Sequence, residues 1–83
     1  MGKVDAAVMD YLRVRQRERG LTPELSGQTA VFDGGLLDSL SLLELVAVVE
    51  DASGQTVDML RFDPSEVETA AELCTELSSA LSG

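Results

Sequence analysis

The sequence contains no histidine, a single cysteine, a single lysine and only three aromatic residues. Without histidine, the chain lacks the side chain most used for acid-base catalysis and a common ligand of zinc. The cysteine, Cys74, has no imidazole to activate it and no internal disulfide partner, so we interpret it as a small core residue in a reducing compartment. There is also no glycine-rich phosphate loop and no cluster with metal-ligand spacing. We therefore predict no enzyme, no catalytic residue and no metal site.

Long apolar runs are missing as well. None approaches the roughly 20 residues that cross a bilayer, and Asp5 and Asp10 interrupt the apolar N-terminal stretch, unlike a signal peptide. These features predict a cytoplasmic protein that is not bound to a membrane. The length of 83 residues predicts one domain over 1–83, with a largely aliphatic core because aromatic residues are scarce.

Charge is distributed unevenly along the chain. Residues 1–32 carry five basic and four acidic side chains, whereas residues 33–83 carry eleven acidic side chains and one arginine, and the total net charge is −9. Such an acidic surface repels nucleic acid and favours partners with basic patches. Neighbouring acids such as Glu50 and Asp51, or Glu66 and Glu68, lack the spacing of a calcium loop and are interpreted as a solvated acidic face.

Four arginines lie close together in the basic part, at positions 13, 15, 17 and 19. Spaced two apart, they fall on different sides of a helix rather than forming one stripe. We interpret them as the solvated C-terminal end of a helix, where the helix dipole favours positive charge.

Apolar residues recur with helical spacing at positions 4, 7, 8, 11, 12 and 14, which predicts a first helix from Val4 to about Arg19, ended by Gly20. The following stretch GLTPELSGQTAVFDGG, residues 20–35, has no helical or strand period and predicts a long connection. Its expected anchors to the core are the apolar residues Leu21, Leu25, Val31 and Phe32.

A second helix is predicted from Asp38 or Ser39 to about Ala52, before the Ser-Gly pair at 53 and 54. Apolar residues cover two lines of this helix. One line holds Leu40, Leu43 and Ala47, and the other holds Leu42, Leu45, Val46 and Val49. So broad an apolar surface predicts a central helix on which some apolar side chains remain outside.

A last helix is predicted to begin near Thr69, because Thr69 and Glu72 have the spacing of a capping box. Its expected inner face consists of Ala70, Leu73, Leu77, Ala80 and Leu81. Between the second and last helices we expect a loop with a short fourth helical turn near Met59–Phe62, and there is no strand pattern. The fold class is thus an all-α small helical bundle with three main helices, a short fourth, and a long loop between the first and second.

The polar pair Asp38 and Ser39 stands between two leucine clusters and allows two interpretations. In the first, Asp38 caps the second helix and Ser39 is only a first-turn residue. Ser41 and Glu44 offer a competing capping box one turn later, so the start of the helix remains open.

In the second interpretation, the serine is a modification site. A helix N-terminus has free amides and the positive end of the dipole, which suits a serine carrying a phosphodiester. Gly34 and Gly35 would let the backbone turn and leave the hydroxyl unobstructed. Since no base lies nearby in the sequence, the modifying enzyme would have to activate the hydroxyl.

The stretch LLDSLSLLELVAVVED, residues 36–51, resembles the attachment region of acyl carrier proteins, in which Asp-Ser-Leu opens the second helix. The order of a leading helix, a long loop, this triplet and a TxxE-capped last helix extends the resemblance over nearly the whole chain. It implies that Ser39 carries covalent 4′-phosphopantetheine, added by a phosphopantetheinyl transferase, and holds acyl groups as thioesters.

The resemblance also implies a docking surface for a monomeric carrier. Asp38 is the acid before the serine, Leu40 the apolar contact after it, and Glu44, Glu50 and Asp51 offer charge to basic patches on acyl-loading, condensing or tailoring enzymes.

Two departures bear on the pathway. Many fatty-acid carriers have an acid at the place of Ser41, and peptidyl carriers tend to differ at the places of Leu37 and Asp38. Together with the arginine-rich first helix, Ser41 favours polyketide or mixed polyketide and nonribosomal peptide biosynthesis. A fatty-acid carrier and an aminoacyl carrier of the D-alanyl type remain alternatives within the family, and an unmodified helical adaptor is the alternative outside it.

Overall fold

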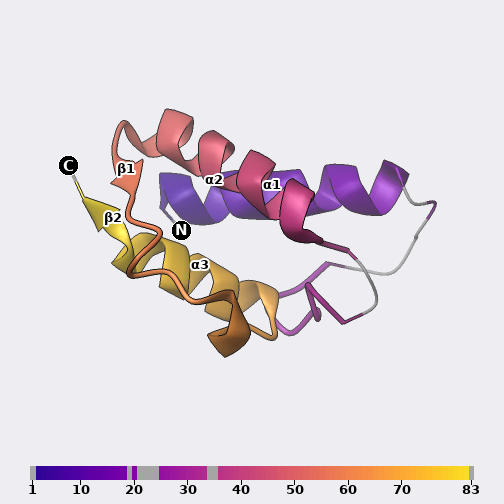
Figure 1. The fold of residues 1–83 in the computed structure, drawn as a ribbon. Helices are drawn as coiled ribbons and strands as arrows, with labels where there is room; N and C mark the ends of the chain where they lie inside the picture. Colours follow the sequence, from indigo (N-terminus) through magenta and orange to yellow (C-terminus); the bar gives the residue numbers. More distant parts are fainter. Residues whose placement is uncertain (1, 19, 21–24, 34–35, 83) are drawn as a thin grey trace.

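The computed structural model describes residues 2–18, 20, 25–33 and 36–82, which form three α-helices and a small two-stranded sheet (Figure 1). The helices are α1 (Lys3–Glu18), α2 (Ser39–Ser53) and α3 (Ala70–Ser79). The shorter elements are the strand β1 (Thr56–Val57), the 3₁₀ helix η1 (Pro64–Glu66) and the strand β2 (Leu81–Ser82). In Figure 1, α1 and α2 run side by side in opposite directions and α3 lies below them. The predicted mostly helical fold is confirmed.

The first two helices end close to where the sequence predicts, whereas α3 ends at Ser79, before the predicted inner-face residue Leu81. Gly20, past the end of α1, has a φ of 70° and donates its N–H to the carbonyl of Arg17. Gly54 has a φ of 71° and donates to the carbonyl of Glu50. Both glycines adopt the left-handed conformation that ends helices at little steric cost. Arg19, the predicted last residue of the first helix, lies outside the described residues.

The capping box of the last helix is confirmed. Thr69 Oγ1 accepts the N–H of Glu72 at 3.3 Å, and the Glu72 carboxylate accepts the N–H of Thr69 at 3.1 Å. The first orphan amides of α3 are thus satisfied locally. Ala70, Leu73, Leu77 and Ala80 of the predicted inner face are fully buried, and Leu81 is half-buried in β2.

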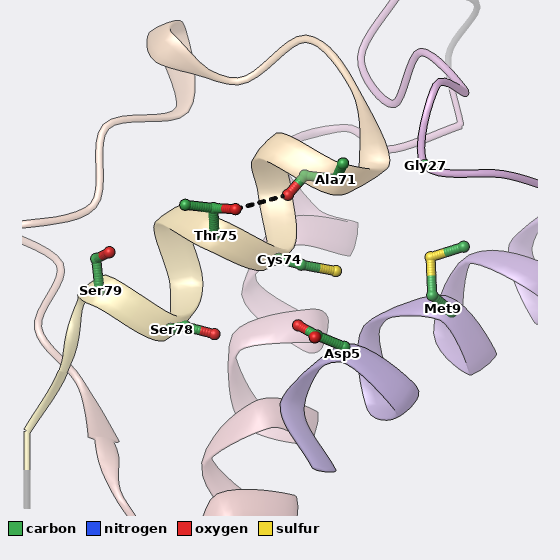
Figure 2. A pocket seen from close by; sticks show the side chains of 8 residues that line it. All are labelled: Asp5, Met9, Gly27, Ala71, Cys74, Thr75, Ser78 and Ser79. Carbon is green, nitrogen blue, oxygen red and sulfur yellow. Dashed lines mark hydrogen bonds between the residues drawn. The ribbon is translucent and has the colours of Figure 1, made fainter. Parts of the chain in front are cut away.

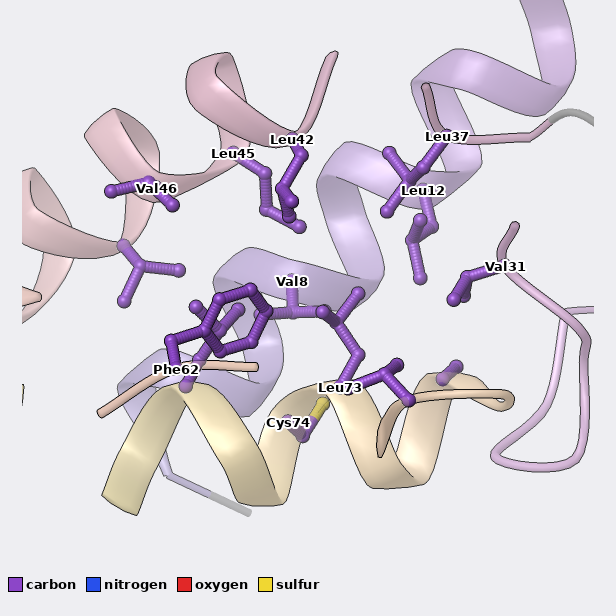
Figure 3. Close-up of a cluster of buried hydrophobic side chains, with 14 of the residues drawn as sticks. Val8, Leu12, Val31, Leu37, Leu42, Leu45, Val46, Phe62, Leu73 and Cys74 are labelled. Atoms are coloured by element: carbon purple, nitrogen blue, oxygen red, sulfur yellow. The ribbon is translucent and has the colours of Figure 1, made fainter. Parts of the chain in front are cut away.

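The core is aliphatic and is built from all three helices (Figure 3). Val8 and Leu12 of α1 and Leu45 and Val49 of α2 are fully buried. The connections add a smaller group of buried side chains: Val31, Leu36, Leu37, Val57, Phe62 and Val67. Burial of such side chains is the main term that holds a domain of this size together.

The connection before α2 is fastened to the start of α3. Ala30 pairs with Thr69 in an isolated bridge, and the N–H of Val31 donates to the carbonyl of Glu68 at 3.0 Å. Of the predicted anchors, Val31 is fully buried, Leu25 and Phe32 are half-buried, and Leu21 lies outside the described residues. These contacts place residues 36–38 at the entrance to α2.

Two predictions for the second half of the chain are corrected. No helix forms at Met59–Phe62. Residues 59–61 form a turn instead, in which the N–H of Arg61 donates to the carbonyl of Asp58. The short helix is η1 instead, a 3₁₀ turn capped by Asp63, whose carboxylate accepts the N–H of Ser65. Phe62, between these two turns, is buried in the core.

The second correction concerns strands. Thr56 pairs with Ser82 and Val57 with Leu81 in the antiparallel pair of β1 and β2. A strand of two residues is too short to produce an alternating pattern, so the sequence carries no period-2 signal for it. Burial of Val57 and partial burial of Leu81 against the core bring the two segments together.

Candidate functional site

Asp38 caps α2 and determines where the helix begins. Its Oδ1 accepts the N–H of Ser41 at 2.8 Å, its carbonyl accepts the N–H of Leu42 at 2.9 Å, and its own backbone is extended. This is the geometry of an N-cap residue. It resolves the open choice in favour of a helix that starts at Ser39, and Ser41 is not the cap.

Ser39 is the first residue of α2 and is exposed to solvent. Ser41, two residues later, is only 3% exposed and faces the interior. The two serines of the DSLS sequence therefore differ in accessibility, and of the two only Ser39 is exposed to solvent. Gly34 and Gly35, expected to turn the chain before this site, lie outside the described residues.

The Asp38 carboxylate is a weak base in this setting. The backbone N–H of Ser41 lowers the pKa of Asp38 below its ordinary value of 3.8, with further contributions from the Ser41 side chain and the positive charge of Arg15. A carboxylate held in its charged form by an amide is poorly suited to removing a proton from the neighbouring hydroxyl. Asp38 is therefore a poor general base for the Ser39 hydroxyl.

Exposed apolar side chains follow Ser39 along α2. Leu40 is 71% exposed and Leu43 is 58% exposed, and Ala47 and Val48 are also exposed farther along the helix. The opposite line, Leu42, Leu45, Val46 and Val49, is buried. The prediction that α2 keeps some apolar residues outside is confirmed, and the exposed line begins directly beside Ser39.

The three acids predicted for docking differ in their surroundings. Asp51 is exposed at the far end of α2. Glu44 is exposed but accepts the hydroxyl hydrogen of Tyr11 of α1 at 3.0 Å. Glu50 is half-buried, and its Oε2 accepts the N–H of Val57 at 2.8 Å. Sequence reasoning missed both contacts, since neither partner lies within a helical turn of the acid.

Sequence reasoning also missed the role of Arg15, one of the four arginines. Its Nε donates to the carbonyl of Leu36 at 3.2 Å, across 21 positions of sequence. The interpretation of these arginines as a uniformly solvated helix end is wrong for Arg15, whose side chain is 19% exposed. Arg13 and Arg17 are exposed as expected, and Arg19 lies outside the described residues.

A second feature lies between α1 and α3. An open hollow there has a volume of about 550 Å³. It is lined by Asp5 and Met9 of α1, Cys74 and Thr75 of α3, and neighbouring small residues, whose side chains Figure 2 shows. Burial raises the pKa of the Cys74 thiol to about 11, and the facing Asp5 carboxylate adds to the effect. The thiol is thus protonated at neutral pH, as expected of a core residue. None of the residues predicted for the α2 site lines this hollow.

Within the described ranges, no three His, Cys, Asp or Glu side chains gather as ligands for a metal ion. No helix among the described residues has the length and apolar character needed to cross a membrane. Comparison of the chain with protein-family models, with curated proteins and with solved structures finds no match.

Proposed function

We propose that this protein is a discrete acyl carrier, modified on Ser39 by 4′-phosphopantetheine. The observation that carries the proposal is the exposed Ser39 at the first position of α2, between the Asp38 cap and the exposed Leu40. A phosphodiester on this hydroxyl would lie at the positive end of the helix dipole. The surroundings of Ser39 therefore fit the group.

The modification is a transfer to the serine oxygen. Ser39 Oγ forms a bond to the phosphorus of the phosphopantetheine part of coenzyme A, the phosphoanhydride bond breaks, and adenosine 3′,5′-bisphosphate leaves. The hydroxyl proton passes to a base of the transferase, because Asp38 is held as a weak base by Ser41. When bound, the arm supplies a terminal thiol that holds an acyl group as a thioester.

The role of the carrier itself is to present the tethered acyl group to successive enzymes. A tethered thioester has a high effective concentration for successive enzymes, and each encounter must end quickly. The exposed line of Leu40 and Leu43 offers a small apolar contact, and Glu44 and Asp51 offer rim charge that speeds association with basic partners. Glu50 contributes mainly to the fold, through Val57.

Within the family, polyketide or mixed polyketide and peptide biosynthesis is the pathway we propose, on the basis of Ser41 and the arginine-rich α1. Burial of Ser41 supports this choice, because an acid at that place would have to turn away from the core to remain solvated. Fatty-acid and aminoacyl carriers are the alternatives, distinguished by which acyl or aminoacyl group a loading enzyme transfers.

A helical adaptor is the second candidate, favoured by the same exposed apolar line on α2. Such a protein would bind a partner through Leu40 and Leu43 with no modification of Ser39. The two functions differ in whether the hydroxyl is needed.

The test is the intact mass of the protein after incubation with coenzyme A and a broad-specificity phosphopantetheinyl transferase. Ser39→Ala is compared with Ser78→Ala, which removes an exposed hydroxyl on α3. We expect one phosphopantetheine on wild type and on Ser78→Ala, and none on Ser39→Ala. An unmodified but folded wild-type protein, beside an active control carrier, would overturn the proposal in favour of the adaptor.

A further inference from the structure

Arg15 of α1 reaches the segment that leads into α2. Its Nε donates to the carbonyl of Leu36 at 3.2 Å, and its Nη1 lies 3.6 Å from Oε1 of Glu18. Leu36 stands three residues before Ser39 in irregular backbone, where a carbonyl has no helix or strand partner. The contact is charge-assisted and therefore stronger than a neutral hydrogen bond.

Tyr11, one turn earlier on α1, contacts a residue that follows Ser39 in the sequence. Its hydroxyl donates to Oε1 of Glu44 at 3.0 Å. Burial raises the pKa of Tyr11, and the hydrogen bond and charge of Glu44 raise it further, so the phenol remains a donor at neutral pH. Residues 11 and 15 lie four apart and share a helix face.

The pair therefore fastens α2 to α1 at two points, one before Ser39 and one after it. The neighbouring Arg13 makes no such contact: it is exposed and pairs with Asp10 of its own helix at 2.9 Å. Of these two arginines, only Arg15 contacts a segment outside α1.

We infer that Tyr11 and Arg15 are positioning residues that hold segment 36–44 on α1, so that Ser39 meets the modifying enzyme in one orientation. This inference rests on the proposed modification of Ser39. Neither residue touches the reacting atoms; both act through Leu36 and Glu44. A reacting hydroxyl that lies about 1 Å from its productive position reacts much more slowly. Holding the segment in place should therefore raise the rate of phosphopantetheinyl transfer.

The experiment compares Arg15→Met with the matched control Arg13→Met. Methionine keeps most of the aliphatic stem and removes every donor, and both substitutions remove one positive charge from α1. Arg15→Lys restores the charge without the guanidinium geometry, and Tyr11→Phe removes only the hydroxyl.

Two quantities are measured. The first is amide hydrogen exchange of residues 36–42 in the unmodified protein, where Leu37, Ser41 and Leu42 donate to described acceptors. The second is kcat and KM for phosphopantetheinyl transfer to each variant. We expect Arg15→Met to speed exchange of this segment and to lower kcat/KM by about tenfold, mainly through kcat, with partial recovery in Arg15→Lys and no change in Arg13→Met.

The outcomes separate the two proposals. If wild type accepts no phosphopantetheine, the proposed function fails, and exchange still reports whether the segment is held. If wild type is modified and Arg15→Met and Tyr11→Phe are modified equally fast, the positioning role is overturned, with or without faster exchange. Should Arg15→Met fail to fold, as judged by circular dichroism, Tyr11→Phe and Arg15→Lys decide the question.

Discussion

Glu50 Oε2 accepts the backbone N–H of Val57 at 2.8 Å and so joins the last turn of α2 to β1. Val57 is buried, and its amide donates to this carboxylate from within β1. An acid that the sequence assigns to partner docking is therefore part of the fold, whereas its neighbour Asp51 is exposed.

The contrast predicts different effects of the two acids on stability. Glu50→Ala leaves the Val57 N–H without its acceptor and should lower the free energy of unfolding by about 1 to 2 kcal/mol. Asp51→Ala, the matched control, should change it by less than about 0.5 kcal/mol. Urea denaturation of both variants measures the difference, and equal stabilities would contradict the structural role of Glu50.

The same contrast predicts different effects on docking. Asp51→Lys reverses an exposed charge on α2 and should lower kcat/KM for phosphopantetheinyl transfer by about threefold or more at low salt. Its thermal midpoint should stay close to that of wild type. Glu66→Lys makes the same charge change on η1 and should leave transfer unaffected. Equal rates for both variants would remove Asp51 from the docking surface.

Glu44→Lys is a less clean test of docking. It reverses a charge but also removes the acceptor of Tyr11, which belongs to the positioning pair. We expect it to reduce transfer more than Asp51→Lys and, unlike Asp51→Lys, to speed amide exchange in segment 36–42. Transfer slowed without faster exchange would mean that Glu44 acts through charge alone.

Cys74 should react slowly with alkylating reagents. With a pKa of about 11, only about one thiol in a thousand is thiolate near pH 8. Folded protein should therefore resist iodoacetamide, and protein in urea should react quickly. A modified carrier would show one fast thiol, on the arm, and one slow thiol. Fast reaction of the folded, unmodified protein would contradict the buried setting of Cys74.

The cap of α2 should weaken in acid. Because the folded pKa of Asp38 lies below its ordinary value of 3.8, ionised Asp38 stabilises the fold above that value, and the stabilisation is lost as pH falls through the folded pKa. Asp38→Asn keeps a capping side chain that does not titrate. The stability advantage of wild type over Asp38→Asn should be constant near neutral pH and shrink below about pH 4. An advantage independent of pH would contradict the charged cap.

Local interactions explain how much of the fold the sequence predicts. The start of α2 at the Asp38 cap, the Thr69–Glu72 capping box and the glycines beyond α1 and α2 all depend on residues three or four apart. Such contacts form within one turn, so spacing and residue type predict them, and the structure had only to choose Asp38 over Ser41 as the cap of α2. Ser39 at the head of a helix belongs to the same class of prediction.

Tertiary packing decided the rest. Both apolar lines of α2 are suitable for a core, and only contact with α1 and α3 placed Leu45 inside and left Leu40 outside. The pairing of β1 with β2 joins segments about 25 positions apart and has no local signal. Arg15 and Arg13 are alike in sequence, and they differ because the Leu36 carbonyl is brought within reach of Arg15 alone. The sequence by itself thus determined the three main helices, through their caps and terminal glycines, because those contacts are local. Packing determined the strand pair, the place of the short helix and which side chains of α2 remain available to a partner.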